Sequence, residues 1–336
     1  MSVNQDQILN ILKDGEFHSG ESLGEALGCS RTAVWKQLQK LENLGLSIES
    51  IKGTGYRVIG GFELLDAKLI LSHLDAQAAD QISSLEIFKT IDSTNKYARD
   101  KADTEASSGT VVLAEQQTAG RGRRGKIWVS PFAANIYLSI VWDFEQGAQA
   151  LEGLSLAIGV AAKRALNTHG LGSVQLKWPN DIYIEGQKLG GILLEMIGDP
   201  AGHCSVIVGV GINVAMPEDQ AAEIDQDWTD VRAQMQLQQG GFDGEVALSK
   251  NHLASALISE IILLLSDFQS QGFSFYRDEW QGADAFYGKQ AAITTPKQSI
   301  SGIVRGVESN GALRLELDNG KIETFIGGEL SLRLSE

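Results

Sequence analysis

Residues 120–126 read Gly-Arg-Gly-Arg-Arg-Gly-Lys, and this stretch decides between two fold classes. Its glycines, Gly120, Gly122 and Gly125, formally match the G-x-G-x-x-G motif of doubly wound dinucleotide-binding folds. In those folds the motif opens a helix, because the helix N-terminus holds the pyrophosphate. Here the following residues, Ile127 to Pro131, are extended in character and end at a proline. The sequence therefore excludes the dinucleotide-binding fold.

The segments on both sides of this stretch predict a mixed sheet. Several apolar runs with strand character follow one another without an intervening helix, which favours an antiparallel or mixed sheet over a strictly alternating one. We expect strands at residues 85–88, 110–114, 135–142, 174–177, 182–184, 189–196 and 206–210. We expect helices at residues 94–102, 149–167, 249–266 and 273–285.

The first sixty residues predict a winged helix-turn-helix. Ser30 is a good N-cap for the third of three short helices. The apolar positions of that helix, Val34, Leu38 and Leu41, repeat at the spacing of one buried face. Residues 46–59 then form two strand-like runs around a glycine turn, which is the pattern of a wing.

The last fifty residues predict a small all-β module. Residues 290–294, 301–308, 311–317 and 321–325 alternate between apolar and polar side chains, with turn residues between them. This pattern is typical of a small barrel. The chain is therefore α+β and multidomain, and we divide it into residues 1–65, 66–280 and 281–336. The polar stretch from residue 216 to residue 241 has some helical character and no assigned role.

Composition limits the function classes. The 336 residues carry 28 Lys and Arg against 43 Asp and Glu, so the net charge is −15. A general nucleic-acid coat would be basic, so that class is excluded, although a local basic patch is not. Only Cys29 and Cys204 are present, which excludes a disulfide scaffold and a cysteine-rich metal site. Without a secretory signal or a long apolar run, we expect no membrane partner and a cytoplasmic location.

The N-terminal module is basic within this acidic chain. Residues 28–60 hold five basic against two acidic side chains, a net charge of +3. Side chains off the apolar face of the third helix are placed to meet a DNA major groove, and basic wing residues suit phosphates or the minor groove. The expected DNA-binding residues are Ser30, Arg31, Thr32, Trp35, Lys36, Gln39, Lys52 and Arg57. A module that binds protein through a charged face remains the alternative.

The arginine- and glycine-rich stretch predicts a mobile anion-binding loop. Four cations occupy the six residues from Arg121 to Lys126, with no acid among them. Glycines allow close approach of the backbone, and arginine forks bind carboxylate or phosphate. A solvated surface turn or a nucleic-acid patch is the alternative at this point.

Three further segments could serve a site. Residues 177–181 read Lys-Trp-Pro-Asn-Asp and break a strand sharply at the proline. Residues 187–195 and 209–213 place glycines inside or at the end of strands, where a ligand or a second backbone can approach. There is no phosphate-loop motif, no zinc H-E-x-x-H motif and no G-x-S-x-G nucleophile elbow. Metal ligands are therefore unassigned.

Taken in order, these motifs resemble those of the bifunctional bacterial biotin ligases that also repress the biotin operon. The set comprises Asp92-Ser-Thr-Asn95, the residues 120–125, Lys177-Trp-Pro-Asn-Asp181, Lys188-Leu-Gly-Gly191 and Gly209-Val-Gly-Ile-Asn213. The resemblance covers essentially the whole chain. It implies a biotin/lipoate-ligase-like central domain and an SH3-like C-terminal barrel.

The resemblance also implies roles for individual residues. Biotin contacts are expected from Ser93, Thr94, Asn95, Gln117, Gly120, Arg121, Arg123, Lys188, Gly190, Gly191 and Gly209. Nucleotide contacts are expected from Trp128, Asn180, Asn213, Arg123 and Lys188. Catalytic roles are expected for Lys188, Arg121, Arg123 and Asp181. The family's best-known repressor has a small polar residue where this chain has Trp35, so a different operator sequence is expected.

The implied chemistry is ATP-dependent biotinylation. Biotin and ATP would form biotinoyl-5′-AMP with Mg²⁺, and biotin would pass to a lysine of the biotin carboxyl carrier protein of acetyl-CoA carboxylase. The adenylate would also act as corepressor, favouring a homodimer on biotin operator DNA. A ligand-responsive DNA-binding regulator with lost or weak ligase activity is the alternative function.

Overall fold

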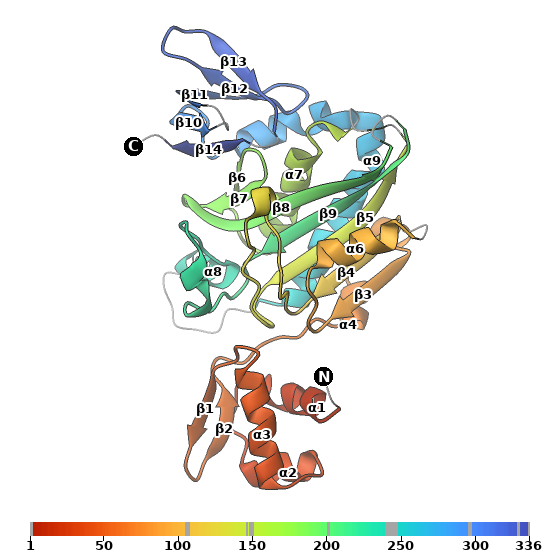
Figure 1. Cartoon of the computed structure of the whole chain (residues 1–336), viewed down its shortest axis with the longest axis vertical. Helices are drawn as coiled ribbons and strands as arrows, with labels where there is room; N and C mark the ends of the chain where they lie inside the picture. Colours follow the sequence, from red (N-terminus) through yellow and green to blue (C-terminus); the bar gives the residue numbers. More distant parts are fainter. Residues whose placement is uncertain are drawn as a thin grey trace.

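A computed structural model describes residues 3–104, 108–145, 147, 151–199, 202–238, 248–294, 298–327 and 330–334. Figure 1 shows three parts along the long axis. Helices and a hairpin lie at one end, a large sheet with helices lies in the middle, and a small sheet that carries the C-terminus lies at the other end. The predicted fold class is confirmed. The division at residues 65 and 280 stays a prediction.

The N-terminal part is a helix-turn-helix followed by a hairpin. It contains α1 (Val3–Leu12), α2 (Gly20–Ala26), α3 (Arg31–Glu42), β1 (Ile48–Ile51) and β2 (Gly55–Val58). The Ser30 hydroxyl accepts a hydrogen bond from the backbone N–H of Ala33 at 3.3 Å and so caps α3. The apolar face of α3 is buried at Val34, Leu38 and Leu41, as its spacing predicts.

The middle part is built on a seven-stranded mixed sheet. Its strands are β3 (Ser84–Phe88), β4 (Thr110–Ala114), β5 (Ile136–Phe144), β6 (Gln175–Lys177), β7 (Asp181–Ile184), β8 (Gln187–Gly198) and β9 (Cys204–Ile212). The order across the sheet is β3-β4-β5-β9-β8-β7-β6. Only β3 and β4 are parallel, and the other neighbours are antiparallel. The absence of intervening helices between β6 and β9 produces this antiparallel half.

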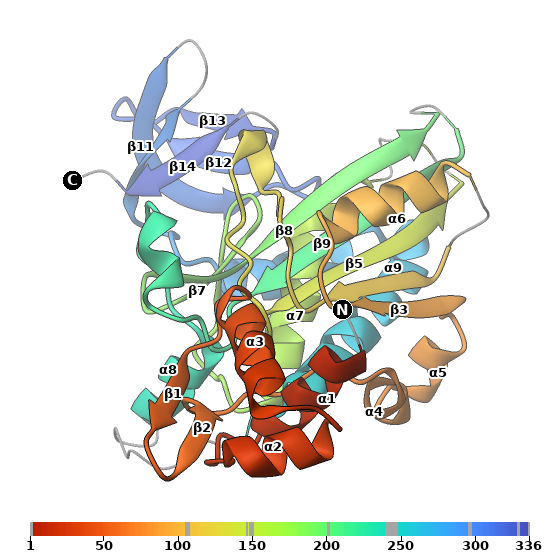
Figure 2. The ribbon, with the colours of Figure 1, turned by 60° about the horizontal axis from the view of Figure 1, so that its bottom comes forward.

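Helices cover the two faces of the sheet unequally (Figures 1 and 2). Helix α6 (Thr94–Ala102) lies on one face, where Gly209 and Gly211 of β9 leave space for the side chains of Asn95 and Trp128. Helices α7 (Leu154–Thr168) and α9 (Lys250–Gly282) pack together on the other face and supply most of the helical part of the core. The short helices α4 (Ala67–Ser72) and α5 (Ala76–Ala79) pack against α9. The first face therefore keeps room for a site.

Helix α9 contains the two helices that the sequence predicts. Its 33 residues are not one continuous helix, because the backbone at Gly272, where φ is +63°, is non-helical and separates the two parts. This element is long and apolar enough to cross a membrane by length and composition alone. However, 61% of its most apolar window is buried inside the protein, so its apolar side chains serve the core. The apolar stretch is thus longer than we expected.

Two other predicted elements change in extent. Helix α7 begins at Leu154, and residues 149 and 150 of the predicted helix lie outside the described residues. The polar stretch from residue 216 contains η3 (Gln220–Glu223) and α8 (Val231–Gln238), while its last residues, 239–241, are also outside the described residues.

The C-terminal part is a five-stranded antiparallel sheet. Its strands are β10 (Gln290–Thr294), β11 (Ser299–Val307), β12 (Leu313–Glu316), β13 (Ile322–Phe325) and β14 (Ser331–Leu334), in the order β13-β12-β11-β10-β14. Strand β14 was not predicted. The indole N–H of Trp178 donates to the carbonyl of Gly311 at 3.1 Å and ties this sheet to the middle part.

A buried ion pair marks the junction with the N-terminal part. Lys250 Nζ lies 2.7 Å from Glu115 Oε2, and the two side chains are only 4% and 2% exposed. The other carboxylate oxygen of Glu115 accepts from the backbone N–H of Leu65, in the segment that leaves the hairpin. A second contact joins Gln220, whose amide donates to the carbonyl of Gly45 at 2.7 Å.

Candidate functional site

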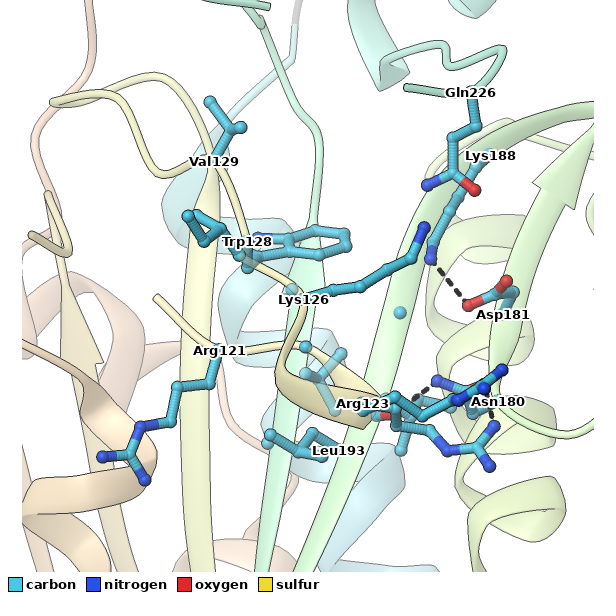
Figure 3. Close-up of a pocket in the computed structure, with 18 of the residues that line it drawn as sticks. Arg121, Arg123, Lys126, Trp128, Val129, Asn180, Asp181, Lys188, Leu193 and Gln226 are labelled. Carbon is cyan, nitrogen blue, oxygen red and sulfur yellow. Dashed lines mark hydrogen bonds and ion pairs between the residues drawn. The ribbon is translucent and has the colours of Figure 1, made fainter. Parts of the chain in front are cut away.

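A cavity of about 580 Å³ opens on the face of the sheet that carries α6. Its walls come from the start of α6, the arginine- and glycine-rich loop, the β6–β7 turn, the glycines of β8 and β9, the segment after β9, and β14. Figure 3 shows Lys126 of the loop pointing toward Lys188 and Arg123 of the loop lying beside Asn180. Segments that are far apart in sequence thus meet at one place.

One end of the cavity is neutral and rich in hydrogen-bonding groups. Gln117 Oε1 accepts from the backbone N–H of Thr94 at 2.9 Å and from its hydroxyl at 3.1 Å. The amide nitrogen of Gln117 donates to Ser130 Oγ at 3.1 Å. Ser93 caps α6, and both Ser93 and Asn95 are buried. These groups suit a compact polar ligand without charge.

Trp128 forms the middle of the cavity wall. Its indole lies directly on the backbone of Gly211, where a Cβ atom would come within 2.6–2.7 Å of three ring atoms. Lys188 Nζ is 5.5 Å from the ring centroid, which is cation–π distance. The Trp128 N–H is buried and has no hydrogen-bond partner within the described part of the chain. That donor is available to a ligand.

The other end of the cavity is cationic. Lys188 Nζ is 2.8 Å from Asp181 Oδ1, and both side chains are about 15% exposed. Lys177 lies opposite Asp181 in the β6–β7 hairpin and contacts the Tyr183 hydroxyl at 3.0 Å. Burial lowers the pKa of Lys177, while Asp181 raises it and Lys188 lowers it further. This end favours an anion, because cations outnumber carboxylates there.

The two predicted loop arginines point in different directions (Figure 3). Arg123 Nη1 donates to Asn180 Oδ1 at 2.9 Å, and Asn180 is held in turn by the Ile192 carbonyl at 2.8 Å. Burial lowers the pKa of Arg123, which nevertheless stays charged. Arg121 turns away from this group toward Glu195, at 3.9 Å. The loop therefore places one arginine near each end of the cavity.

The formerly unassigned polar stretch closes the cavity from a further side. Lys126 Nζ of the loop forms an ion pair with Asp225 at 3.2 Å. The backbone N–H of Lys188 donates to the Asp227 carbonyl at 3.0 Å, and the Lys188 carbonyl accepts from Thr229 N–H at 3.0 Å. The stretch therefore fixes the backbone of Lys188 on both sides.

Several predicted ligand contacts are placed differently. Gly120 and Gly190 are absent from the cavity wall as the structure describes it. A Cβ at Gly120 would meet the carbonyl of Trp128, so the loop's own chain needs that space. A Cβ at Gly190 would meet the side chain of Ile212 on the core side. At Gly209 the Asn95 side chain occupies the space that a Cβ atom would need. This contact accounts for a glycine at that position without a ligand.

Other predicted residues line the cavity. The structure brings together Ser93, Thr94, Asn95, Gln117, Arg121, Arg123, Trp128, Asn180, Asp181, Lys188, Gly191, Gly209 and Asn213. Asn213 also has a structural contact, because its amide donates to the Thr229 carbonyl at 3.1 Å. Sequence reasoning missed Tyr137, Trp228 and Arg333. The sequence signal for Trp228 was a single tryptophan within a polar stretch. Nothing in the sequence indicated that Arg333 would line the cavity.

The predicted DNA-binding face is only partly free. Arg31, Thr32, Trp35, Lys36 and Gln39 are exposed on α3, and the Trp35 side chain is 49% exposed. The hydroxyl of Ser30 is engaged as the helix cap. The guanidinium of Arg57 pairs with Glu49 at 2.7 Å and lies over the Phe17 ring, so it is engaged within the hairpin.

No group of three or more His, Cys, Asp or Glu side chains that could hold a metal occurs in the described residues. Near Lys188, the cavity offers the carboxylate of Asp181, which is already paired. Mg²⁺ needs six oxygen ligands but commonly takes most of them from water and phosphate. The site therefore does not fit a magnesium ion held by the protein alone.

Comparisons with known proteins agree with this arrangement. Three family profiles match in order: the HTH domain at residues 4–57, the biotin/lipoate A/B protein ligase family at 87–213, and the biotin protein ligase C terminal domain at 286–333. The bifunctional ligase/repressor BirA of Escherichia coli is 40% identical over 98% of this chain and 97% of its own length. The biotin–[acetyl-CoA-carboxylase] ligase of Paracoccus denitrificans is 32% identical over 70% of this chain and 98% of its own. Among solved structures, a biotin protein ligase from Aquifex aeolicus in complex with biotin and ATP matches with a TM-score of 0.62 and 26% identity, over 76% of this chain and all of that one.

Proposed function

The chain belongs to the family of bifunctional biotin ligases and repressors, and we propose that it biotinylates a carrier protein and represses transcription at an operator. One observation carries the proposal. A single cavity joins a neutral hydrogen-bonding end to a cationic end, with Trp128 between them. Biotin has a neutral ureido ring at one end and a carboxylate at the other. The two ends of the cavity match these two chemical groups.

The neutral end suits the ureido ring. The ring offers one carbonyl acceptor and two N–H donors, and the hydroxyls and amides of Ser93, Thr94, Asn95 and Gln117 can supply both partners. Ser93, Thr94 and Asn95 are buried, which excludes competing water and strengthens their hydrogen bonds. We assign biotin binding to this group, with Arg121 and Gly191 beside it.

The cationic end suits the first chemical step. The biotin carboxylate attacks the α-phosphorus of ATP, the bond to the bridging oxygen breaks, and pyrophosphate leaves with that electron pair. Two anions must approach for this to happen. Lys188 and Arg123 would neutralise their repulsion and the charge that develops on the phosphoryl oxygens. The ion pair with Asp181 holds Lys188 in place, and Trp128 and Asn180 flank the predicted nucleotide position.

Loop closure protects the product. Biotinoyl-5′-AMP is a mixed anhydride that water hydrolyses, so the site must exclude water until the acceptor arrives. The ion pair of Lys126 with Asp225 joins the two segments that cover the cavity. It is exposed, so it contributes little stability and can open for the acceptor protein.

In the second step a lysine amine of the carrier protein attacks the anhydride carbonyl. The new amide bond forms, AMP leaves, and the amine loses a proton. We propose Asp181 as the group that receives this proton, because it is the carboxylate paired with Lys188 beside the reacting atoms. The chain then needs no covalent nucleophile. The carrier protein of acetyl-CoA carboxylase is the proposed acceptor.

Mg²⁺ stays a prediction. If it takes part, the phosphates of ATP and water must supply most of its ligands, since the described residues form no metal-binding cluster. Its chemistry would be to offset phosphate charge. No step above depends on it.

The N-terminal module would supply the repressor activity. Exposed Arg31, Lys36 and Gln39 on α3 can reach base edges, and Lys52 of the wing can reach a phosphate. We propose that bound adenylate favours a homodimer, which pairs two such modules on two half-sites, in the cytoplasm. Sedimentation with and without biotinoyl-AMP tests this, and equal monomer fractions would exclude it.

The ligase proposal has a direct test. Biotin-dependent exchange of labelled pyrophosphate into ATP reports the first step alone. We expect exchange by the native chain and its loss in Lys188→Met. No exchange by the folded native chain would leave the alternative, a DNA-binding regulator without ligase activity.

A further inference from the structure

Glu195 lies behind Asn95, outside the residues that line the cavity, and was not assigned a role. It sits on β8, on the same face as Gly191 and Leu193, and its side chain is 20% exposed. One carboxylate oxygen accepts from Asn95 Nδ2 at 2.9 Å. The other lies 3.8 Å from Arg99 Nη1 and 3.9 Å from Arg121 Nη1. One carboxylate therefore meets the start of α6, its last turn and the arginine-rich loop.

The contact with Asn95 fixes which way that amide points. A carboxylate can only accept, so the nitrogen of the Asn95 amide must face Glu195. The amide oxygen then faces Ser139 Oγ, at 2.7 Å. The amide packs on Gly209, where a side chain would collide with it, and this contact prevents it from moving aside.

The fixed amide in turn orients two hydroxyl groups. Ser139 is fully buried, and its Oγ is also 2.8 Å from Thr94 Oγ1. Ser139 has one hydroxyl proton, and Asn95 Oδ1 needs it because an amide oxygen cannot donate. Thr94 therefore keeps its own proton for Gln117 or Ser139 and presents lone pairs to the cavity, which it lines.

We propose that Glu195 is a positioning residue that sets this hydrogen-bond direction and makes Thr94 an acceptor for an N–H group of the ligand. The inference rests on the proposed function, which supplies a ligand with ureido N–H donors. Without the carboxylate, the Asn95 amide can turn over and the Ser139 proton moves to Thr94. It then occupies one of the two lone pairs of the Thr94 oxygen, which weakens this acceptor toward the ligand. Glu195 does this without touching the ligand.

The test compares three folded variants in the pyrophosphate exchange assay and by calorimetry with biotin alone. In Glu195→Gln we expect the KM and Kd for biotin to rise about tenfold. The reason is that the hydrogen bond from Asn95 to a charged carboxylate sets the direction of the hydrogen bonds through Ser139 to Thr94. The KM for ATP and kcat should stay within about twofold, since only ground-state binding of biotin changes. A general loss of structure would change all of these constants.

Two further variants make the result decisive. Ser139→Ala removes the next link without touching Arg121 or Arg99, and it should also raise the Kd for biotin. Glu86→Gln is the matched control: Glu86 holds the same helix to the sheet through Tyr97 and Lys101, away from the cavity, and should leave the Kd unchanged. If Glu195→Gln does not fold, Ser139→Ala decides alone.

The outcomes separate this inference from the proposed function. Unchanged biotin affinity in Glu195→Gln and Ser139→Ala overturns the positioning role, and so does an equal loss of affinity in Glu86→Gln. A native chain that binds biotin but exchanges no pyrophosphate overturns the ligase proposal instead. A native chain that does not bind biotin overturns both.

Discussion

A methyl group at Gly211 tests whether Trp128 must lie where the structure places it. A Cβ there would be 2.6 Å from Cε2 and 2.7 Å from Cζ2 and Nε1 of the indole. Carbon atoms in contact are about 3.5–4.0 Å apart, so the ring must retreat by roughly 1 Å. Overpacking of this kind costs about 1–3 kcal/mol. The retreat also moves the ring relative to Lys188, whose Nζ is 5.5 Å from its centroid.

The effect on activity should be larger than the effect on stability. Misplacing a positioning group by about 1 Å next to the reacting atoms can cost on the order of 100-fold in rate. We therefore expect Gly211→Ala to lose about 100-fold in kcat/KM for ATP in the pyrophosphate exchange assay, while the chain stays folded. Gly172→Ala is the matched control, because nothing lies within 4 Å of its Cβ position. Gly211→Ala activity within threefold of the native chain would refute the assignment of Trp128 to the site.

Three further predictions concern stability and DNA binding. Lys250→Met leaves Glu115 as an unpaired buried carboxylate, so thermal unfolding should show a loss of about 3–5 kcal/mol; a change under 1 kcal/mol would contradict this. Burial raises the pKa of Asp284 from 3.8 to about 6, and its Oδ2 has no hydrogen-bond partner in the described part of the chain. The folded state therefore holds the Asp284 proton more tightly than the unfolded state. The loss of folding stability caused by ionising this carboxyl is absent below pH 3.8 and complete above about pH 6. Asp284→Asn should therefore raise the Tm at pH 7.5 but hardly at pH 4, and an equal shift at both values would disprove it. Lys52→Ala should weaken operator binding and reduce the slope of log K against log salt by about 0.9 in gel retardation; an unchanged slope would place Lys52 off the phosphates.

The elements were the most predictable part of the molecule. Helix α6 and strands β4 and β10 have the predicted bounds, because the apolar spacing and the flanking caps are local signals. Strand β14 was missed because it is four residues long and needs the neighbouring strand β10 to complete it. The two predicted helices of α9 are present and are separated at Gly272, because a glycine with φ of +63° interrupts helical geometry.

The site was predictable in its residue types but less so in its geometry. The ordered motifs named many of the side chains that line the cavity, including Lys188 and Asp181. Sequence could not reveal that Gly211 is open for Trp128 and Gly209 for Asn95, because each pair comes from segments far apart in the chain. A glycine that the sequence suggests as a ligand contact can therefore provide space for another side chain of the protein instead.

Directions of side chains were also beyond the sequence. Arg121 and Arg123 are two residues apart and were given similar roles, yet one approaches Glu195 and the other Asn180. Glu195 itself carried no motif and was missed for that reason. The polar stretch after residue 216 had no assigned role, since its contact with Lys188 is made by backbone groups alone.

The central claim is that one cavity makes the ligand that controls DNA binding. Its most direct test is gel retardation of a duplex selected by this chain in the presence of biotinoyl-AMP. The native chain should retard this duplex with biotin and ATP as well as with preformed biotinoyl-AMP. Lys188→Met should need the preformed adenylate. A native chain that responds to added adenylate but not to biotin with ATP would contradict the claim, as would retardation that is the same without any ligand.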